Sequence, residues 1–421
     1  MKPLITLITI STIITTSCDK QPKHEYPTSK TEMINDIYYG EMRETMTNDY
    51  PKYLSTIKEL VALNENNPFF QYHLGRAQYL VGNSNKGFDA IKKHVSQIQT
   101  LEYVVSDSLL IANIETDQIK QLQSTYSNGK PEKAEQVAFE LPQQGFTAEG
   151  LTISPISKSI YLGSIRLGKI IEIDSSGNIN DFISEHQFDI ENILGLEIDQ
   201  RGEYLYACGE YTDSATQQLK SGVFKFNLTN GQLKQRFLPN DTLNHEFNDL
   251  TIINDEVYVT DSKSGGLYKI KNDQMSLFID QHELSLTNGI TKTPEGRFLF
   301  ITDMFFGVMK YDLQKNEHKW LKMPDHFTLT SIDGLTYHKG GLIAHQFTLN
   351  GIYYYTIEDD SITQKTTISH GHPLLKDHTT GDVLGHTYYF IANSDIDILN
   401  RYGNDVSADS LNNTFILKQE L

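Results

Sequence analysis

Apolar residues follow two different patterns along the chain, and the change between them falls near residue 130. Over 31–130 they recur three and four residues apart, which predicts amphipathic helices. Over 136–421 they alternate with polar residues in short runs bounded by turn residues such as Ser176-Gly177, which predicts antiparallel strands joined by hairpins. The pattern therefore predicts a helical domain and a strand domain, joined by a linker at 127–131.

A turn-plus-strand unit recurs six times in the strand domain. The units begin with Glu149-Gly150-Leu151, Leu194-Gly195-Leu196, Asn248-Asp249-Leu250, Asn288-Gly289-Ile290, Asp333-Gly334-Leu335 and Gly381-Asp382-Val383. Their starts lie about 40 to 54 residues apart, which is the period of a four-stranded propeller blade. The predicted fold class is mainly β, a six-bladed β-propeller preceded by a small α-helical domain.

Closure of the propeller and the second strand of each unit give further expectations. Residues 136–141 precede the first unit and are expected to pair with 414–417, which would close the ring and protect the sheet edges. Each second strand has a small or polar residue at its fourth place. Two of these, Asp261 and Asp303, are interpreted as turn caps rather than ligands.

Cys208 lies in an apolar strand, so buried packing is its expected role.

The segment over 65–95 resembles a tetratricopeptide helix pair. Pro68 suits a first helical turn, Gly75 permits close approach of two helices, and Gly82 can end a helix. Only one such repeat is clear, and one repeat cannot bury a continuous solenoid core. Two interpretations therefore stay open: a groove that binds a protein partner, or a spacer that packs on the propeller or holds it away from a membrane.

The chain begins like an exported protein. Met1-Lys2 is followed by an apolar stretch over 4–14, which is too short to span a bilayer and predicts a signal peptide over 1–17. Small residues before Cys18 resemble the lipobox of bacterial lipoproteins, in which that Cys becomes the lipidated first residue, although Thr15 stands where Leu is usual. We expect a lipid anchor at Cys18, a polar tether over 18–30 and a place in the cell envelope; the alternative is an ordinary signal peptide with Cys18 incidental.

Charge limits the partners. The chain has 36 basic and 54 acidic residues and a net charge of −18, which argues against binding to nucleic acid or anionic lipid headgroups. Membrane contact is therefore expected through the lipid anchor only. With Cys18 acylated, Cys208 would be the only remaining thiol, so no intramolecular disulfide could form.

The first place of four units holds an oxygen-bearing side chain: Glu149, Asn248, Asn288 and Asp333. The innermost strand of each propeller blade runs beside the central channel, so these side chains should face one another. Two carboxylates and two amide carbonyls are hard oxygen donors of the kind that Ca²⁺ accepts. We expect a divalent cation, Ca²⁺ foremost; Mg²⁺, Mn²⁺ and Zn²⁺ stay open, although Zn²⁺ normally prefers His or Cys, which these places lack.

The residues around these places resemble a known family. The motifs are Ala148-Glu149-Gly150-Leu151, Glu246-Phe247-Asn248-Asp249-Leu250, Thr287-Asn288-Gly289-Ile290 and Ile332-Asp333-Gly334-Leu335. Over about 138–421 the chain resembles the regucalcin and gluconolactonase family of six-bladed propellers and, more distantly, paraoxonases and strictosidine synthases. The resemblance implies that Glu149, Asn288 and Asp333 are the primary ligands of a divalent cation, that Asn248 is a ligand or substrate contact, and that Asp333 is also the general base.

The resemblance implies a cation-dependent hydrolase that acts on a small-molecule ester or lactone. Glu246 departs from the family, whose sugar-lactone hydrolases have Arg there, and an acidic side chain cannot hold a lactone as an Arg fork would. Asp333 on a cation would be a weak base, so Glu246, His345 or Asp382 could serve as a second acceptor. Glu246 and His345 are the predicted substrate contacts, although strand alternation leaves the direction of His345 open.

The alternative function is a non-catalytic propeller. In that interpretation the cation is structural, the channel face binds a ligand or a cell-surface partner, and the helical domain supplies a second contact to a protein partner.

Overall fold

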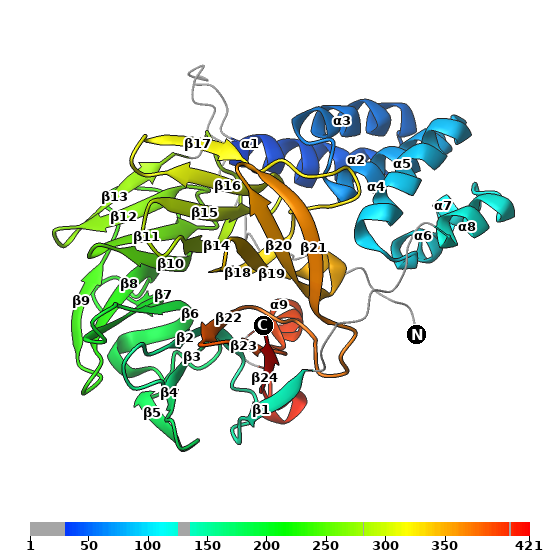
Figure 1. Cartoon of the computed structure of the whole chain (residues 1–421). Coiled ribbons are helices and arrows are strands. Elements are labelled where there is room, and N and C mark those ends of the chain that lie inside the picture. The colour runs from blue at the N-terminus through cyan, green and yellow to red at the C-terminus, as the bar shows by residue number, and fades with distance from the viewer. Residues whose placement is uncertain (1–29, 125–134, 281, 404–405) are drawn as a thin grey trace.

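The computed structural model describes residues 30–124, 135–280, 282–403 and 406–421. The signal peptide, Cys18, the tether and the linker at 127–131 lie outside the described residues. Helices occupy the first part of the described chain and strands the rest, which confirms the predicted order and the fold class (Figure 1). In these described ranges no helix has both the length and the apolar character needed to cross a bilayer.

The helical segment contains a closely packed antiparallel pair. Its elements are α1 (Lys30–Ile34), the π-helix η1 (Asn35–Glu41), α2 (Met42–Thr45), α3 (Tyr50–Leu63), α4 (Pro68–Leu80), α5 (Ser84–Ile98), α6 (Glu102–Ser106), α7 (Ser108–Ile111) and α8 (Thr116–Gln123). A Cβ on Gly75 of α4 would lie 2.6 Å from Ile91 of α5, so glycine is required there for close approach. Gly82, at φ +85°, follows the end of α4, as predicted.

The strands form six four-stranded sheets around a central axis. The first five blades are β2 (Ala148–Ile153) to β5 (Ile179–Ile183), β6 (Ile190–Ile198) to β9 (Leu233–Phe237), β10 (Phe247–Ile253) to β13 (Gln274–Ile279), β14 (Thr287–Lys292) to β17 (Glu317–Trp320) and β18 (Ile332–His338) to β21 (Ser361–His370). Each has its strands in sequence order. In Figure 1 the first strand of each of these five blades lies nearest the axis.

The strands between these ends have the following bounds: β3 (Ile160–Ser164), β4 (Ile170–Ile173), β7 (Tyr204–Thr212), β8 (Leu219–Asn227), β11 (Glu256–Asp261), β12 (Leu267–Lys271), β15 (Phe298–Asp303), β16 (Gly307–Asp312), β19 (Gly341–Gln346) and β20 (Gly351–Glu358). Three short 3₁₀ turns, η2 (Gln187–Asp189), η3 (Phe347–Leu349) and η4 (Ala408–Ser410), and helix α9 (Ile396–Tyr402) lie in the connections. Gly177, Gly202, Gly231, Gly296 and Gly340 have positive φ at the predicted hairpins.

The sixth blade joins the two ends of the propeller. Its order is β1 (Gln136–Glu140), β24 (Phe415–Glu420), β23 (Thr387–Ile391) and β22 (Gly381–Leu384). Val137 pairs with Leu417 and Glu140 with Phe415, antiparallel. The predicted closure is therefore confirmed, and the first strand of the propeller is the outermost strand of its last blade.

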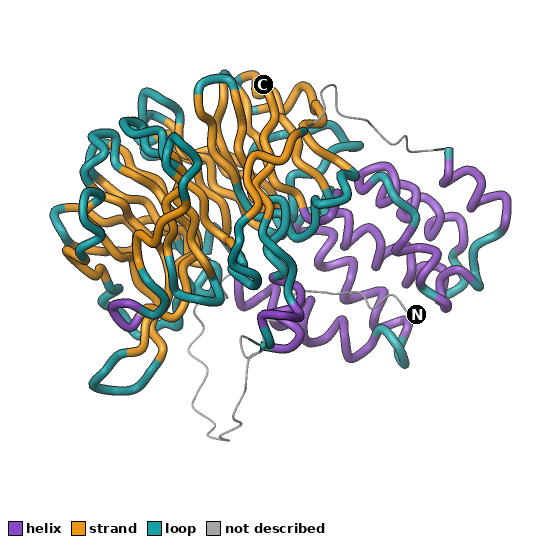
Figure 2. Tube along the Cα trace, turned by 90° about the horizontal axis from the view of Figure 1, so that it is seen from below, coloured by secondary structure: helices purple, strands orange, loops and turns teal. Residues whose placement is uncertain are grey.

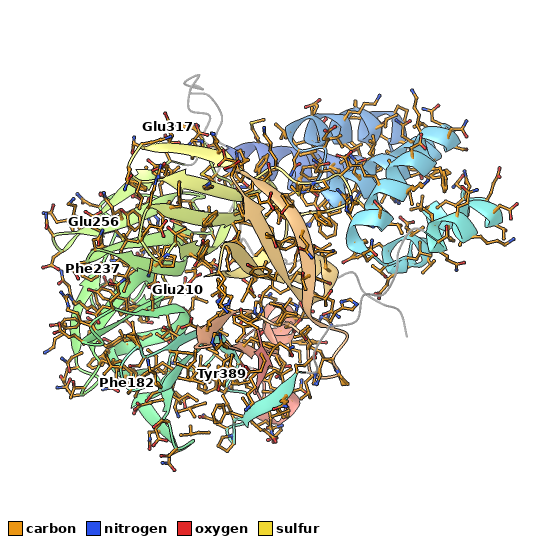
Figure 3. All side chains as sticks on the ribbon, in the orientation of Figure 1. Phe182, Glu210, Phe237, Glu256, Glu317 and Tyr389 are labelled. Carbon is orange, nitrogen blue, oxygen red and sulfur yellow. The ribbon has the colours of Figure 1, made fainter. Side chains whose placement is uncertain are left out.

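The core lies between neighbouring blades rather than at one centre. Ile170 of blade 1 packs with Leu196 and Phe224 of blade 2, and Cys208 packs with Val257 of blade 3. Figure 3 shows side chains filling the spaces between the sheets. β2 and β3 are buried along their whole length, because both of their faces are covered by other blades. Cys208 is a free, fully buried thiol, as predicted.

The helical segment packs on one side of the propeller in both views (Figures 1 and 2). Phe305, in the turn between β15 and β16, is buried among Ile34, Tyr38 and Phe70. The side-chain amides of Asn64 and Asn67 both donate to the Phe305 carbonyl, at 2.7 and 3.1 Å. The spacer interpretation is thereby refined: the helices are held against the propeller.

These contacts lie on one face of the propeller. Asp303 at the end of β15 pairs with Thr287 at the start of β14, so the Phe305 turn lies where innermost strands begin. Thr31 donates to the Ser285 carbonyl (2.9 Å) and Gln97 to that of Asp325 (3.2 Å), both in loops that lead into innermost strands. We call this face, where the innermost strands begin, the mouth face. The helices therefore lie on the same face as the predicted ring of oxygen ligands.

Removal of the Phe305 ring should weaken this docking. Phe305 is 6 % exposed, and its ring stacks on Phe70 with centroids 6.0 Å apart. Phe305→Ala should lower the free energy of unfolding by about 3–4 kcal/mol, measured by urea denaturation, because it leaves a cavity between the two parts. Ile156→Ala, at a residue 68 % exposed, is the control and should change stability by less than about 0.5 kcal/mol. Equal effects of the two substitutions would contradict the docking.

Candidate metal centre

The structure brings the four predicted oxygen ligands together. Glu149 on β2, Asn248 on β10, Asn288 on β14 and Asp333 on β18 all line one cavity of about 20 Å³ at the propeller axis. The other residues that line it are Gly195, Asp249, Gly334, Thr379 and Thr380. Four blades far apart in sequence therefore contribute one side chain each to a single site. Their role as metal ligands stays a prediction.

A β-bulge at the start of the innermost strand places each ring residue. In blade 1, pairing with β3 is regular up to Ala148 and resumes at Leu151, so Glu149 and Gly150 are left out of the ladder. The same shift leaves out Leu194-Gly195, Asn248-Asp249, Asn288-Gly289 and Asp333-Gly334 in the next four blades. A bulge bends the strand and re-aims a side chain. Because of the bulge, the first residue of the unit lies beside the channel. Regular pairing would instead hold that residue within the sheet.

The glycine after each ring residue allows neighbouring strands to touch. A Cβ on Gly150 would lie 2.1 Å from the Leu194 carbonyl oxygen, and one on Gly289 would lie 2.3 Å from that of Asp333. Gly195 and Gly334 face the next blade in the same way. None of the four has positive φ. These dipeptides therefore serve close backbone approach around the axis and not tight turns.

The sixth unit was placed two residues too late by the sequence pattern. Gly334 approaches the Thr379 carbonyl as Gly289 approaches that of Asp333, so Thr379 is the equivalent residue in blade 6. The Thr379 hydroxyl donates to the Glu149 carbonyl at 2.9 Å and completes the circle. Asp382 instead accepts from the backbone N–H groups of Val383 and Ile153, at 2.7 and 3.0 Å, so it links blades 6 and 1 and lies outside the cavity lining.

The fourth-place residues of the second strands hold the loops that precede the ring. Asp261 accepts from the backbone N–H of Glu246 at 3.0 Å and from that of Ser264 at 3.1 Å. Asp303 accepts from the backbone N–H groups of Ser285, Phe305 and Phe306. The interpretation of both carboxylates as turn caps is confirmed.

Burial of the two ring carboxylates raises their affinity for protons. Glu149 is 9 % exposed and Asp333 is 5 % exposed. Burial, and after it the charges of Asp333 and Asp249, raise the pKa of Glu149 well above its usual value. Burial and the charge of Asp249 raise the pKa of Asp333 to about 8, against the effect of a hydrogen bond with Asn288. The residues that line the cavity include no basic side chain to compensate these charges.

A divalent cation fits the site in three respects. The Glu149 Oε2 atom is buried and has no hydrogen-bond partner among the described residues. The cavity exceeds the roughly 10–15 Å³ that one water-sized particle needs, and it is far smaller than a lactone. The donors are carboxylate and amide oxygens, the set that Ca²⁺ takes. Within the described ranges no three His, Cys, Asp or Glu side chains form a metal-binding group, so a cation here would depend on the Asn248 and Asn288 amides.

The predicted substrate contacts lie outside the lining of this cavity. Glu246 is two residues before Asn248, and its charge contributes to the raised pKa of Glu149. Its own pKa is raised by burial and by the charge of Glu210. Glu246 is therefore near the ring without being part of it.

His345 points away from the channel. It is fully buried, its Nε2 lies 2.9 Å from the Tyr388 hydroxyl, and its Nδ1 lies 3.2 Å from His378 Nδ1. Alternation along β19 directs this side chain between blades 5 and 6, where burial holds the pKa of both imidazoles below the usual value. The structure does not support His345 as a substrate contact.

Asp249 and Thr379 are site residues that the sequence analysis missed. Asp249 occupies the place of the close-approach glycine, and its carboxylate accepts from the backbone N–H of Leu250 (2.9 Å) and Ile290 (3.1 Å). Burial raises the pKa of Asp249 to about 7. The sequence did contain a signal for Asp249, because the third unit has Asp at the second place where other units have glycine. Thr379 was missed because the sixth unit was placed two residues too late.

Comparison with known proteins gives distant likenesses only. No protein-family model and no curated protein sequence matches the chain. A solved gluconolactonase from Xanthomonas campestris has a TM-score of 0.46 and 11 % identity over 66 % of this chain and 87 % of that one. A luciferin-regenerating enzyme has a TM-score of 0.47 and 10 % identity over 66 % and 93 %.

An aldose sugar dehydrogenase from Streptomyces coelicolor, in its PQQ-bound form, is as similar. It has a TM-score of 0.46 and 11 % identity over 69 % of this chain and the whole of that one. Proteins of different chemistry thus match equally well. The likenesses therefore carry no argument about activity, and the case for a function has to come from the ring itself.

Stability of the metal-free protein should fall as pH rises from 6.5 to 8. The folded pKa values of Asp249 and Asp333 exceed those of the unfolded chain, so their stabilising effect is complete below about pH 4 and is lost as pH rises through about 7 to 8. Over this window the two carboxylates together should contribute a loss of about 2 kcal/mol, measured by urea denaturation in EDTA, and Asp333 should account for the larger share. Buried histidines act in the opposite direction, by about 0.4 kcal/mol each, because half of each is still protonated in the unfolded chain at pH 6.5. The effect of the carboxylates is therefore read from the difference between the parent protein and Asp333→Asn.

Ca²⁺ should reverse this loss, because the cation requires deprotonated ligands. Asp333→Asn should flatten the pH dependence in EDTA and weaken the effect of Ca²⁺, whereas Glu203→Gln on the surface should change neither. Identical pH profiles for Asp333→Asn and the parent protein, with no stabilisation by Ca²⁺ at pH 8, would refute the site.

Proposed function

We propose that the protein is a divalent-cation-dependent hydrolase of esters or lactones, with Ca²⁺ the expected cation at the ring. One observation carries the proposal: the buried Glu149 carboxylate has an unpartnered Oε2 in an ion-sized cavity that it shares with Asp333. Two buried carboxylates without a counter-charge are strongly destabilising, and a cation would relieve that cost. The resemblance of the ring motifs to the gluconolactonase family gives the reaction class.

The cation would be held by Glu149, Asn288 and Asp333, with Asn248 as a further oxygen donor. When bound, it would supply a Lewis acid that polarises a carbonyl oxygen. Because the cavity has room for little more than an ion, a substrate would lie outside it on the mouth face, beside the helical segment.

Carboxylates of the chain itself would accept the proton in this reaction. Asp333, held by the Asn288 amide, is the candidate to take a proton from the attacking water. Of the three second acceptors considered from sequence, Asp382 is occupied by backbone N–H groups and His345 is sealed between two blades. Glu246 is left, with a pKa raised towards the operating range, as the second proton acceptor.

Turnover should depend on the ring. A panel of lactones and aryl esters, assayed with EDTA and with Ca²⁺, should contain at least one substrate that is hydrolysed only with the cation. Asp333→Asn and Glu149→Gln should lower its kcat/KM by about 100-fold or more, since each removes a charge needed in the transition state. Asp359→Asn, which keeps a residue tolerant of positive φ at a surface turn, should leave the rate unchanged. A rate that is indifferent to both EDTA and Asp333→Asn would exclude the proposal.

A non-catalytic propeller is the second candidate, and two observations favour it. The ring cavity is too small for a substrate, and Glu246 stands where the lactonases that the chain resembles have Arg. In this version the cation holds four blades together, and the mouth face with its helices contacts a ligand or a protein partner. Stabilisation by Ca²⁺ without turnover of any panel member would support this version.

We also propose that the protein is exported and anchored in the cell envelope through a lipid on Cys18. The support is the apolar stretch over 4–14 and the small residues before Cys18. In a bacterial host the full chain should fractionate with membranes, and mass spectrometry should find Cys18 as an acylated N-terminal residue. Cys18→Ser should release the protein into the soluble fraction, whereas Cys208→Ser should not. Cleavage without acylation would indicate an ordinary signal peptide.

A further inference from the structure

A second cavity lies at the seam between blades 5 and 6. Its volume is about 280 Å³, and its walls include His338 from β18, Tyr354 from β20, Thr367 and Ile368 from β21, and Gln419 from β24. His338 follows Asp333 by five residues on one strand, so the cavity is roughly 17 Å from the ring, towards the opposite face. It is therefore separate from the candidate metal centre.

Two polar atoms in the wall of this seam cavity, each with almost no exposed surface of its own, have no partner among the described residues. Gln419 is only 5 % exposed, and its side-chain carbonyl Oε1 accepts no hydrogen bond. His338 Nε2 is likewise buried and unpaired. The Tyr354 hydroxyl is already engaged, donating to the backbone carbonyls of His338 (3.0 Å) and Lys339 (3.1 Å). An unpaired buried acceptor is unfavourable, so a ligand that donates to Gln419 would recover part of that free energy.

The remaining walls define the rest of the ligand. Most of the surface is apolar, from Ile368, Leu421, the Tyr354 ring and threonine methyl groups. Burial and the neighbouring Lys339 and His386 lower the pKa of His338, so its imidazole is neutral at pH 7. The charged residues Lys339 and Glu420 are exposed, at the rim. No charged side chain lies in the interior, which favours an uncharged ligand.

Size limits the ligand further. A cavity of about 150 Å³ accommodates benzene, so one of about 280 Å³ suits a molecule of two fused rings. We propose that the seam cavity binds a small, uncharged, planar aromatic molecule that donates one hydrogen bond to Gln419 Oε1. Such a ligand contacts β21, the outermost strand of blade 5, and β24, the last strand of the chain. It therefore bridges blade 5 and blade 6, the blade that closes the propeller.

Indole and benzofuran are suitable probes, because they have nearly the same shape and only indole has an N–H donor. Titration of the full-length protein, followed in isoleucine methyl spectra through Ile368, should show saturable binding of indole. Benzofuran should bind about tenfold more weakly, the equivalent of one lost hydrogen bond. Both affinities should be unchanged by EDTA and by Asp333→Asn, since the two sites are separate.

Two variants test the assignment. Thr367→Trp should fill the cavity and abolish binding of both probes. Gln419→Leu should remove the preference for indole and leave benzofuran binding intact, and Gln274→Leu, on the exposed surface of blade 3, should change nothing. No saturable binding of indole, or binding that Thr367→Trp does not affect, would overturn the proposal. If Gln419→Leu does not fold, the proposal is still tested by two measurements: the preference of the parent protein for indole over benzofuran, and the loss of binding in Thr367→Trp.

Discussion

Close approach of the innermost strands around the axis is the constraint on which this structure depends. Each of five innermost strands has a bulge at its start, and the residue after the ring residue lies against the backbone of the next blade. Glycine satisfies that contact in four blades, while Asp249 makes a hydrogen bond there to the Ile290 backbone N–H of blade 4. The hydroxyl of Thr379 closes the last gap. The same geometry that packs the blades thereby brings side chains from blades 1, 3, 4, 5 and 6 into a common cavity.

This geometry creates an electrostatic problem that explains the chemistry of the ring. Glu149 and Asp333 are buried together, with Asp249 close enough to raise both of their pKa values. Carboxylates removed from water favour protonation unless a cation neutralises them. Strands, bulges and turn caps such as Asp261 and Asp303 hold the ring in place, so the repulsion cannot be relieved by movement of the backbone. The two ring carboxylates therefore favour the protonated state in the absence of a cation.

The helical segment packs against the loops of the mouth face. It is tied to blades 3 to 5 by the buried Phe305 ring and by amide side chains that donate to loop carbonyls, among them Asn64 and Gln97. Thr31 and Gln97 bond to Ser285 and Asp325, whose loops lead directly into the strands that bear Asn288 and Asp333. Helix docking and ring geometry are thus coupled through a few short loops, whereas the seam cavity lies at the far end of the same strands.

The sequence by itself determined the repeat, the blade number, the closing strand and the four oxygen-bearing residues. These follow from local pattern: alternation fixes strands, period fixes blades, and equivalent places in a closed ring must face one axis. Only the tertiary structure decided the rest. Asp249 and Thr379 became visible through contacts between blades, and the start of the sixth unit moved because only the approach of Gly334 to the Thr379 carbonyl shows which residue of blade 6 is equivalent to Asp333. The direction of His345 was undetermined from sequence, because alternation gives two faces and only the packing of blades 5 and 6 shows which one is buried.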